Sequence, residues 1–266
     1  MNFNIDQKIF DDYPNLKIGI ILVKNMNNSK RVSSVEGLLR GISAQRGREF
    51  AEKDIHEDPM IRAWDYAYGK FGINPRKYRC SIAGLLKTVK EGKEIPRINT
   101  LVDLYNYYSL KFLLPIGGED LDWLYGDLNL TYTKGGEAFR PLESIEIQKA
   151  KEGEAAYIDS GGITCRYWNH RVCERTKFTE KTINAAIIVE DMSKMHLDQF
   201  GNNLREIQNG IYKYIGGQIE SYILTEETPY MDLGIEGRQN ADDSKVPRQE
   251  KAHFLELERL KNKAKE

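Results

Sequence analysis

Three polar side chains share one face of a helix predicted near the middle of the chain. Within PRINTLVDLYNYYSLKFLLPIGGED (residues 96–120), the hydrophobic spacing predicts a helix over residues 101–113. Asp103 and Asn106 are three residues apart, and Tyr107 is four residues from Asp103, so the three side chains lie close together on the helix. Any of these side chains that is buried must be hydrogen-bonded, because an unpaired polar group inside a protein is costly.

The residue types that bind zinc occur together only once. Cys165, His170 and Cys173 form a C-x4-H-x2-C grouping, but a structural zinc site normally has a fourth ligand and closer pairs. We therefore expect no metal site. The remaining histidines each stand alone in the sequence and are expected to be surface or capping residues: His56, His196 and His253.

Several enzyme classes lack their characteristic motifs in this sequence. There is no G-x-x-x-x-G-K-[ST] loop, no G-x-S-x-G elbow and no H-E-x-x-H helix. ATP-dependent catalysis, serine hydrolysis and zinc proteolysis therefore have no support, and no cofactor is expected.

Composition is typical of a globular protein in a reducing compartment. The chain has 266 residues, of which 40% are apolar, and it has three cysteines without paired spacing. Its first residues contain no basic segment followed by an apolar one, and no apolar run is long enough to span a bilayer. These features predict a cytoplasmic protein without a membrane segment.

The overall charge is balanced, with 39 Lys and Arg against 40 Asp and Glu, so no general attraction to nucleic acid is expected. Two segments are locally basic. Residues 70–97 contain eight basic residues and two acids, and residues 163–181 contain five basic residues and two acids. Each is either an RNA-binding surface or an ordinary solvated surface with acidic residues folded beside it.

Periodicity and turn residues predict helices mixed with strands. The predicted helices cover residues 32–53, 59–71 (capped by Asp58), 81–90, 101–113 (capped by Asn99 or Thr100) and 197–214. The predicted strands cover residues 16–24, 183–191 and 219–225, with hairpins over 127–142, turning at 135–136, and 154–168, turning at 160–162. We expect one domain over residues 1–228. Residues 229–266 are expected to form a charged tail, partly helical or disordered, because they offer too few apolar residues for a core.

The helix segment and two later segments carry a resemblance to a known family. In PRINTLVDLYNYYSLKFLLPIGGED the spacing resembles a Pro-x-x-Asn-x-x-x-Asp-x-x-Asn-Tyr helix followed by a proline loop, and YIDSGGITCRYWNHR and INAAIIVED resemble a hairpin with a loop and a glutamate-bearing strand. Together they resemble the B3/B4 domain of the phenylalanyl-tRNA synthetase beta subunit. The resemblance covers residues 74–192 well and extends to about 12–226 when free-standing family members are included. It implies an α+β fold with mixed sheets in a β-sandwich-like core, flanked by helices.

In the synthetase, this domain hydrolyses mischarged tRNA, so the resemblance implies an aminoacyl-tRNA deacylase acting in trans on the acylated 3′ end of tRNA. Glu190 matches the glutamate of the family's pocket, and Asn169 is expected to act with it in catalysis. The implied RNA-binding residues are Arg97, Arg171 and Lys177, and Trp168 could stack on the terminal adenosine. The implied substrate-binding residues are Asp103, Asn106, Tyr107, Gly117, Gly118, Trp168 and His170.

Two departures from the family leave alternatives open. Gly117 stands where the synthetase has a histidine, and Arg166–Arg171 replaces a glycine-rich loop. A non-catalytic module that binds tRNA or aminoacyl-adenosine is the first alternative function, and an accessory subunit of a larger complex is the second. At the residue level, Glu190 could simply end its strand, and Trp168 could be a core aromatic residue.

Overall fold

The computed structural model describes residues 1–236 of the 266-residue chain. Its helices are α1 (Gln7–Asp12), α2 (Ser33–Glu49), α3 (Pro59–Lys70), α4 (Ser81–Lys90), α5 (Thr100–Phe112) and α6 (Leu197–Tyr214). Its longer strands are β2 (Lys17–Lys24), β3 (Ile116–Asp120), β4 (Leu128–Tyr132), β7 (Ala155–Asp159), β8 (Gly162–Arg166), β10 (Ala185–Asp191) and β11 (Gln218–Leu224). The shorter strands are β1 (Asn2–Ile5), β5 (Ala138–Phe139), β6 (Gln148–Lys149), β9 (Arg171–Val172) and β12 (Tyr230–Asp232).

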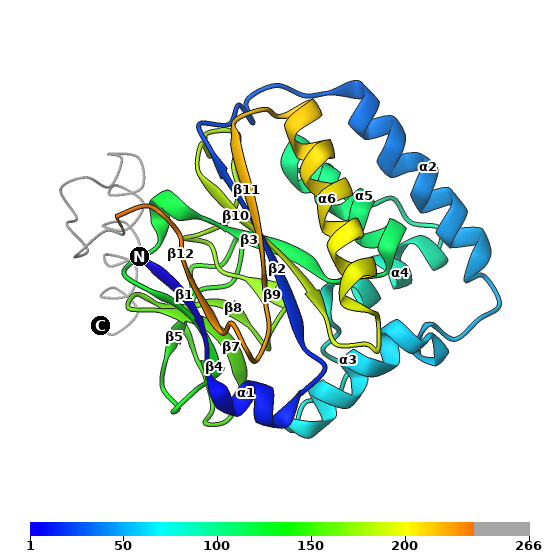
Figure 1. Cartoon of the computed structure of the whole chain (residues 1–266). Coiled ribbons are helices and arrows are strands. Elements are labelled where there is room, and N and C mark those ends of the chain that lie inside the picture. Colours follow the sequence, from blue (N-terminus) through cyan, green and yellow to red (C-terminus); the bar gives the residue numbers. More distant parts are fainter. Residues whose placement is uncertain (237–266) are drawn as a thin grey trace, which may run out of the picture.

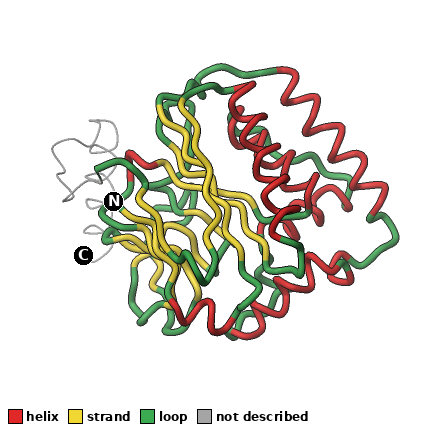
Figure 2. Tube along the Cα trace, viewed as in Figure 1, coloured by secondary structure: helices red, strands yellow, loops and turns green. Residues whose placement is uncertain are grey.

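Two sheets and a helical layer form the body of the molecule, which confirms the predicted α+β class (Figures 1 and 2). A four-stranded antiparallel sheet has the order β11-β2-β10-β3, and a six-stranded mixed sheet has the order β12-β1-β4-β7-β8-β9. Helices α5 and α6 lie on one side of the four-stranded sheet, while the six-stranded sheet lies on the other (Figure 1). The four-stranded sheet is therefore covered on both faces.

Successive side chains of β10 pack alternately against the helices and against the six-stranded sheet. Ile187 and Val189 pack in the cluster that contains Phe200 and Leu204 of α6. Ile188 and its neighbour Ala186 pack in the other cluster, with residues of the six-stranded sheet. Because successive side chains of a strand point to opposite faces, a strand covered on both sides is apolar throughout. This explains the uninterrupted apolar runs from which β2 and β10 were predicted.

Helix ends agree closely with the capping residues in the sequence. The side chain of Asn99 accepts a hydrogen bond from the backbone N–H of Val102, 3.0 Å away, and Asp58 caps α3 in the same way at the N–H of Met60, 2.9 Å away. The helix predicted over residues 32–53 ends earlier, because Phe50 leaves the helix and is buried in the core.

The hairpin predicted over residues 127–142 is wrong. Strand β4 pairs with β7 and, in parallel, with β1, while β5 pairs with β6 after a turn at residues 135–136. Leu128 and Leu130 of β4 are fully buried between these distant strands. Their burial outweighs the local turn preference of Gly135–Gly136, and residues 136–139 instead pair with residues 148–150. The second predicted hairpin, β7 to β8, is confirmed.

The six-stranded sheet extends past residue 228, where the folded domain was expected to end. Strand β12 pairs antiparallel with β1, and the N-terminal amine of Met1 donates a hydrogen bond to the carbonyl of Ile235. The helical tail expected further along lies outside the described residues. Within residues 1–236, no helix is long and apolar enough to cross a bilayer.

Candidate functional site

Glu190 lies between the two sheets, near the end of strand β10. It is paired in register with Ile18 of β2, and like Ile188 it projects from the face that the six-stranded sheet covers. Only 3% of Glu190 is exposed. A carboxylate in such a place is destabilising unless hydrogen bonds replace its lost hydration.

Three donors from the opposite layer provide those hydrogen bonds. The Tyr157 hydroxyl and the Trp168 indole N–H both donate to Glu190 Oε1, the latter over 2.7 Å. The Asn169 amide N–H donates to Oε2 over 2.5 Å. Tyr157 belongs to β7, and the other two donors lie in the turn between β8 and β9. Glu190 therefore joins the two sheets through hydrogen bonds.

The turn that carries Trp168 and Asn169 is held by an unusual backbone and by packing. Tyr167 and Trp168 both have left-handed backbones, with φ of 49° and 62°. Such a conformation is costly for aromatic residues and persists only when the surroundings enforce it. The Trp168 ring is fully buried in edge-on contact with Tyr13 and Trp64. The backbone N–H of Trp168 donates to the carbonyl of Ala155 over 2.6 Å.

Asn169 is oriented by Tyr68 of α3. The Tyr68 hydroxyl lies 3.0 Å from Asn169 Oδ1 and 2.7 Å from the carbonyl oxygen of Tyr167. Asn169 is half-buried, so its amide lies between the buried carboxylate of Glu190 and the surface. The Asn169 amide is thus held in one orientation by Tyr68 and Glu190.

Burial makes Glu190 easier to protonate than a carboxyl group in water. Burial raises the pKa of Glu190 to about 7, although the hydrogen bonds from Tyr157, Asn169 and Trp168 lower it. Burial and the adjacent Glu190 raise the pKa of the Tyr157 hydroxyl well above its usual value. A carboxyl group with a pKa near neutrality can exchange protons at physiological pH.

A second buried carboxyl group, Glu119 of β3, lies on the same face of the four-stranded sheet. It is paired with Ala186 of β10, and Gly117 is paired with Ile188, so both positions face the six-stranded sheet. Burial raises the pKa of Glu119 to about 7. Sequence analysis missed Glu119 because residues 116–120 were interpreted as a loop, whereas they form a strand. The sequence feature that could have identified Glu119 is an acidic residue directly after the two glycines at 117 and 118.

The two glycines before Glu119 have opposite surroundings. A Cβ atom on Gly117 would have no atom within 4 Å, so open space adjoins this half-exposed residue. A Cβ atom on Gly118 would lie 2.2 Å from the carbonyl oxygen of Ala186 and 2.8 Å from Phe178. Gly118 is therefore required for packing, and Gly117 borders the site.

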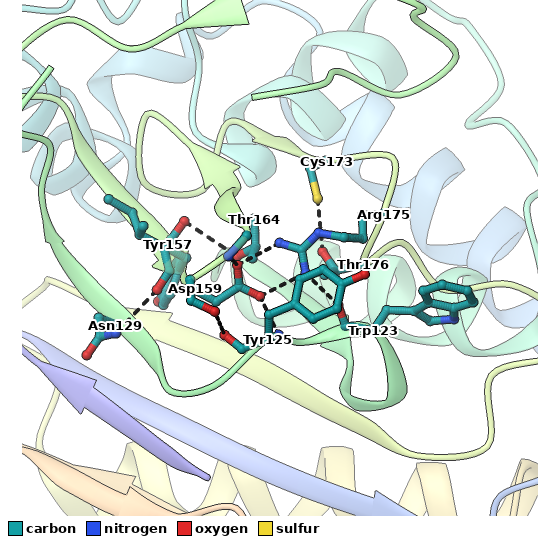
Figure 3. A network of polar contacts seen from close by, with 12 residues as sticks. Trp123, Tyr125, Asn129, Tyr157, Asp159, Thr164, Cys173, Arg175 and Thr176 are labelled. Carbon is teal, nitrogen blue, oxygen red and sulfur yellow. Dashed lines mark hydrogen bonds and ion pairs between the residues drawn. The ribbon is translucent and has the colours of Figure 1, made fainter. Parts of the chain in front are cut away.

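Figure 3 shows a polar network around Asp159 and Arg175 that includes Thr164 and Thr176. Thr164, Thr176 and Arg175 each lower the pKa of Glu119, so this network adjoins it. Arg175 binds both carboxylate oxygens of Asp159, at 2.7 and 2.8 Å, and its guanidinium group lies over the ring of Tyr125. Burial is the largest single influence on the pKa of Arg175 and lowers it. The hydrogen bonds and the charge of Asp159 both raise this pKa, and the net result is a raised pKa. Because both charges of this pair are satisfied by each other, Arg175 is not a dedicated partner for Glu119.

Arg171, exposed, and Arg79, half-buried, are close enough to His170 to affect its pKa, whereas Arg166 is buried and paired with Glu154. The His170 ring lies 2.7 Å from the carbonyl oxygen of Arg79 through Nδ1. Burial lowers the pKa of His170, and the charges of Arg171, Arg79 and Arg166 lower it further. His170 is therefore neutral near pH 7, and the positive charge of this surface comes from arginine.

Predicted site residues on α5 are divided between two places. Asp103 is buried and accepts hydrogen bonds from Arg97 Nε, at 3.1 Å, and from the backbone N–H of Ile98, at 3.2 Å, so it closes the helix N-terminus. Tyr107 lines a groove of about 520 Å³ between α2 and α5, together with Arg46 and other residues away from Glu190.

Tyr105 of α5 packs against Phe178, with ring centroids 6.3 Å apart, in the cluster on the helical side of the four-stranded sheet. Burial raises the pKa of the Tyr105 hydroxyl, and the neighbouring charges of Cys165, Glu119 and Asp103 raise it further. Asn106 is half-buried on the same helix. Sequence spacing identified the Asp103 face but gave no reason to select Tyr105.

The three predicted RNA-binding residues have different surroundings. Arg171 is exposed beside His170. Lys177 forms an ion pair with Glu174, and Arg97 forms ion pairs with Asp103 and Glu36. Within residues 1–236, no group of three or more His, Cys, Asp or Glu side chains is arranged to hold a metal ion.

The fold and the site together define an α+β domain with a buried glutamate between its sheets. Residues 63–205, more than half of the chain, match the family model of the B3/4 domain, so the chain belongs to the B3/4 domain family. This membership supports a role connected with tRNA.

A similar solved structure is the N-terminal fragment of the phenylalanyl-tRNA synthetase beta-subunit from Pyrococcus horikoshii. The sequences are 15% identical, the match covers 82% of this chain and 49% of that one, and the TM-score is 0.42. This chain thus spans about half the length of that fragment. No curated protein matches the sequence.

Proposed function

We propose that this protein hydrolyses mischarged aminoacyl-tRNA in trans, cleaving the ester between the amino acid and the terminal ribose. The observation that carries the proposal is the Glu190 carboxylate, held by Tyr157, Trp168 and Asn169 between the sheets. Membership of the B3/4 family and the resemblance to the editing domain of the synthetase supply the reaction type.

The chemistry requires orientation more than a reactive side chain. Water attacks the ester carbonyl, the ester bond to the ribose oxygen breaks, and the amino acid and tRNA are released. Asn169 is fixed by Tyr68 on one side and Glu190 on the other, which allows it to hold the aminoacyl group or the attacking water. Glu190 would read a hydrogen-bond donor of the amino acid, since a buried acceptor rejects analogues that lack the donor.

The arginine residues around His170 suit the phosphates of the tRNA 3′ end. Arg171 is exposed, and Arg79 Nε has no hydrogen-bond partner among residues 1–236. Arg79 also lines a groove of about 200 Å³ with Lys87 and Lys90, within the basic segment noted in the sequence, and the acids Asp54 and Glu91 line it too. This groove would guide the RNA toward Asn169, because clustered cations track a phosphate backbone.

The test is a deacylation assay with a panel of tRNAs, each carrying a wrong amino acid. We expect the protein to release at least one amino acid faster than buffer does. Asn169→Ala should slow that release about 100-fold, because a poorly oriented reacting group costs a factor of this size. Asn209→Ala is the matched control, since Asn209 is exposed on α6, and it should retain the full rate.

The non-catalytic alternative gives a different outcome. Gly117, with open space beside it, stands where the synthetase has a histidine, which favours binding without hydrolysis. If tRNA binds but no member of the panel is released faster than in buffer, the protein is a binding module and the deacylase proposal is wrong.

A further inference from the structure

Glu119 is a buried carboxyl group that the site described so far does not use. Only 1% of it is exposed, and among residues 1–236 its Oε2 has no hydrogen-bond partner. The hydroxyls of Thr176 and Thr164 lie close enough to lower its pKa, yet burial outweighs them. A buried acceptor without a partner costs free energy and requires an explanation.

Open space lies next to Glu119 on the face that it shares with Glu190. Gly117 is two residues away on β3, so its missing side chain would point to the same side as Glu119. No atom lies within 4 Å of the position that a Cβ on Gly117 would occupy, and Gly117 is half-exposed. A ligand that reaches this space from the surface would meet Glu119.

The positions of Glu119 and Glu190 allow one small molecule to contact both. Glu119 is opposite Ala186, which is four residues before Glu190 on β10, so the two are about 13 Å apart along the sheet. Both carboxyl groups affect the Cys165 thiol of β8, because after burial the charges of Glu119 and Glu190 raise its pKa most.

Charge determines which ligand group suits Glu119. Arg175 is the cation that lowers its pKa, but both terminal nitrogens of Arg175 are bound to Asp159. Glu190 already accepts three hydrogen bonds, whereas Glu119 keeps a free oxygen. A protonated amine satisfies a buried carboxylate best, since it supplies both a donor and the opposite charge.

We propose that Glu119 binds a protonated amine of the aminoacyl group, so that the site holds its substrate between two carboxylates, Glu119 at the amine and Glu190 at another donor. The proposal rests on the function proposed above. The amine is either the α-amino group, which every aminoacyl ester carries, or the side-chain amine of a basic amino acid.

Non-hydrolysable analogues distinguish these two sources. Calorimetry would measure the affinity of four 3′-amide-linked adenosines, carrying phenylalanine, 3-phenylpropanoate, lysine or 6-aminohexanoate. If the α-amino group binds, phenylalanine should be preferred over 3-phenylpropanoate by at least about tenfold, since charged hydrogen bonds contribute that much. If the side-chain amine binds, 6-aminohexanoate should be preferred over 3-phenylpropanoate by a similar factor.

The variant Glu119→Gln should abolish whichever preference is observed, while its affinity for 3-phenylpropanoyl-adenosine stays unchanged. Glu180→Gln, an exposed position, is the matched control and should retain the preference. Thermal melting of both variants verifies folding. If the analogues bind but Glu119→Gln keeps the preference for an amine, the role of Glu119 is overturned and the deacylase proposal stands. The same conclusion follows if the native protein shows no preference for an amine. If no analogue binds, both proposals fail.

Discussion

Replacing Glu190 by glutamine removes a buried charge and keeps the shape of the side chain. The new carbonyl oxygen can accept from Tyr157 and Trp168, as Oε1 does now. The new amide N–H would face the amide N–H of Asn169, a conflict that a flip of Asn169 resolves. After the flip, the Tyr68 hydroxyl can accept from Asn169 and donate to the carbonyl of Tyr167, 2.7 Å away. The hydrogen-bond network therefore survives the substitution.

The gain in stability follows from the pKa of Glu190, which burial raises from 4.5 to about 7. Because the folded state holds this proton more tightly than the unfolded state, the stability from the protonated acid is complete below pH 4.5 and is lost as pH rises through about 7. The full loss is about 3 kcal/mol, most of which falls between pH 5 and pH 8. Glutamine does not titrate, so Glu190→Gln should gain that amount over the native protein.

Urea unfolding at pH 5, 6, 7 and 8 measures the difference in free energy of unfolding between the two proteins. The contribution of Glu119, with its own raised pKa, is common to both proteins and cancels. Glu180→Gln provides the baseline for the same substitution at an exposed position. A difference that stays constant or shrinks as pH rises would show that Glu190 is not held as a desolvated acid, and the electrostatic account of the site would be refuted.

Three further outcomes are expected. Gly117→Ala should keep nearly native stability, whereas Gly118→Ala should lose more than about 2 kcal/mol of unfolding free energy in urea, because only a Cβ at position 118 would collide with the backbone. Equal losses in the two variants would contradict the open space beside Gly117. Asp159→Ala should cost about 3–5 kcal/mol of unfolding free energy by leaving Arg175 without its carboxylate partner. A loss below about 1 kcal/mol would show that the pair is not needed. Arg79→Ala should weaken tRNA binding, measured by filter binding at several salt concentrations, and should reduce the slope of log affinity against log salt by about one. Arg97→Ala should change the affinity for tRNA less, because Arg97 is already paired with two acids. A larger effect of Arg97→Ala than of Arg79→Ala would place the RNA on the Arg97 side.

Local signals in the sequence were sufficient for most helices and for the strands of the four-stranded sheet. Helix α4 spans the predicted residues, and so does α6, because each has a clear apolar face and a clear stop. The six-stranded sheet was harder to predict, since β1 and β4 are joined only through long-range pairing. No local pattern specifies which distant strands will meet, and burial of residues such as Leu130 decides the outcome.

The site, like the fold, was only partly predictable from the sequence, because some of its residues come from distant elements. The resemblance placed Glu190 and Asn169 together, and the structure shows them hydrogen-bonded. It gave no indication that Tyr157 and Tyr68 would complete the network, because these residues reach Glu190 and Asn169 from separate elements. Trp168 was left open between stacking on a base and packing in the core, and its complete burial matches the second alternative.

Strand β1 lies between β4 and β12, so residues 2–5 pair with residues 230–232 near the far end of the described chain. During synthesis on the ribosome, β1 emerges long before β12 and keeps one edge unpaired until residue 232 is available. Unpaired strand edges promote association between chains. A shortened protein that stops at residue 228 would carry that exposed edge permanently, and expression of the domain should therefore include β12.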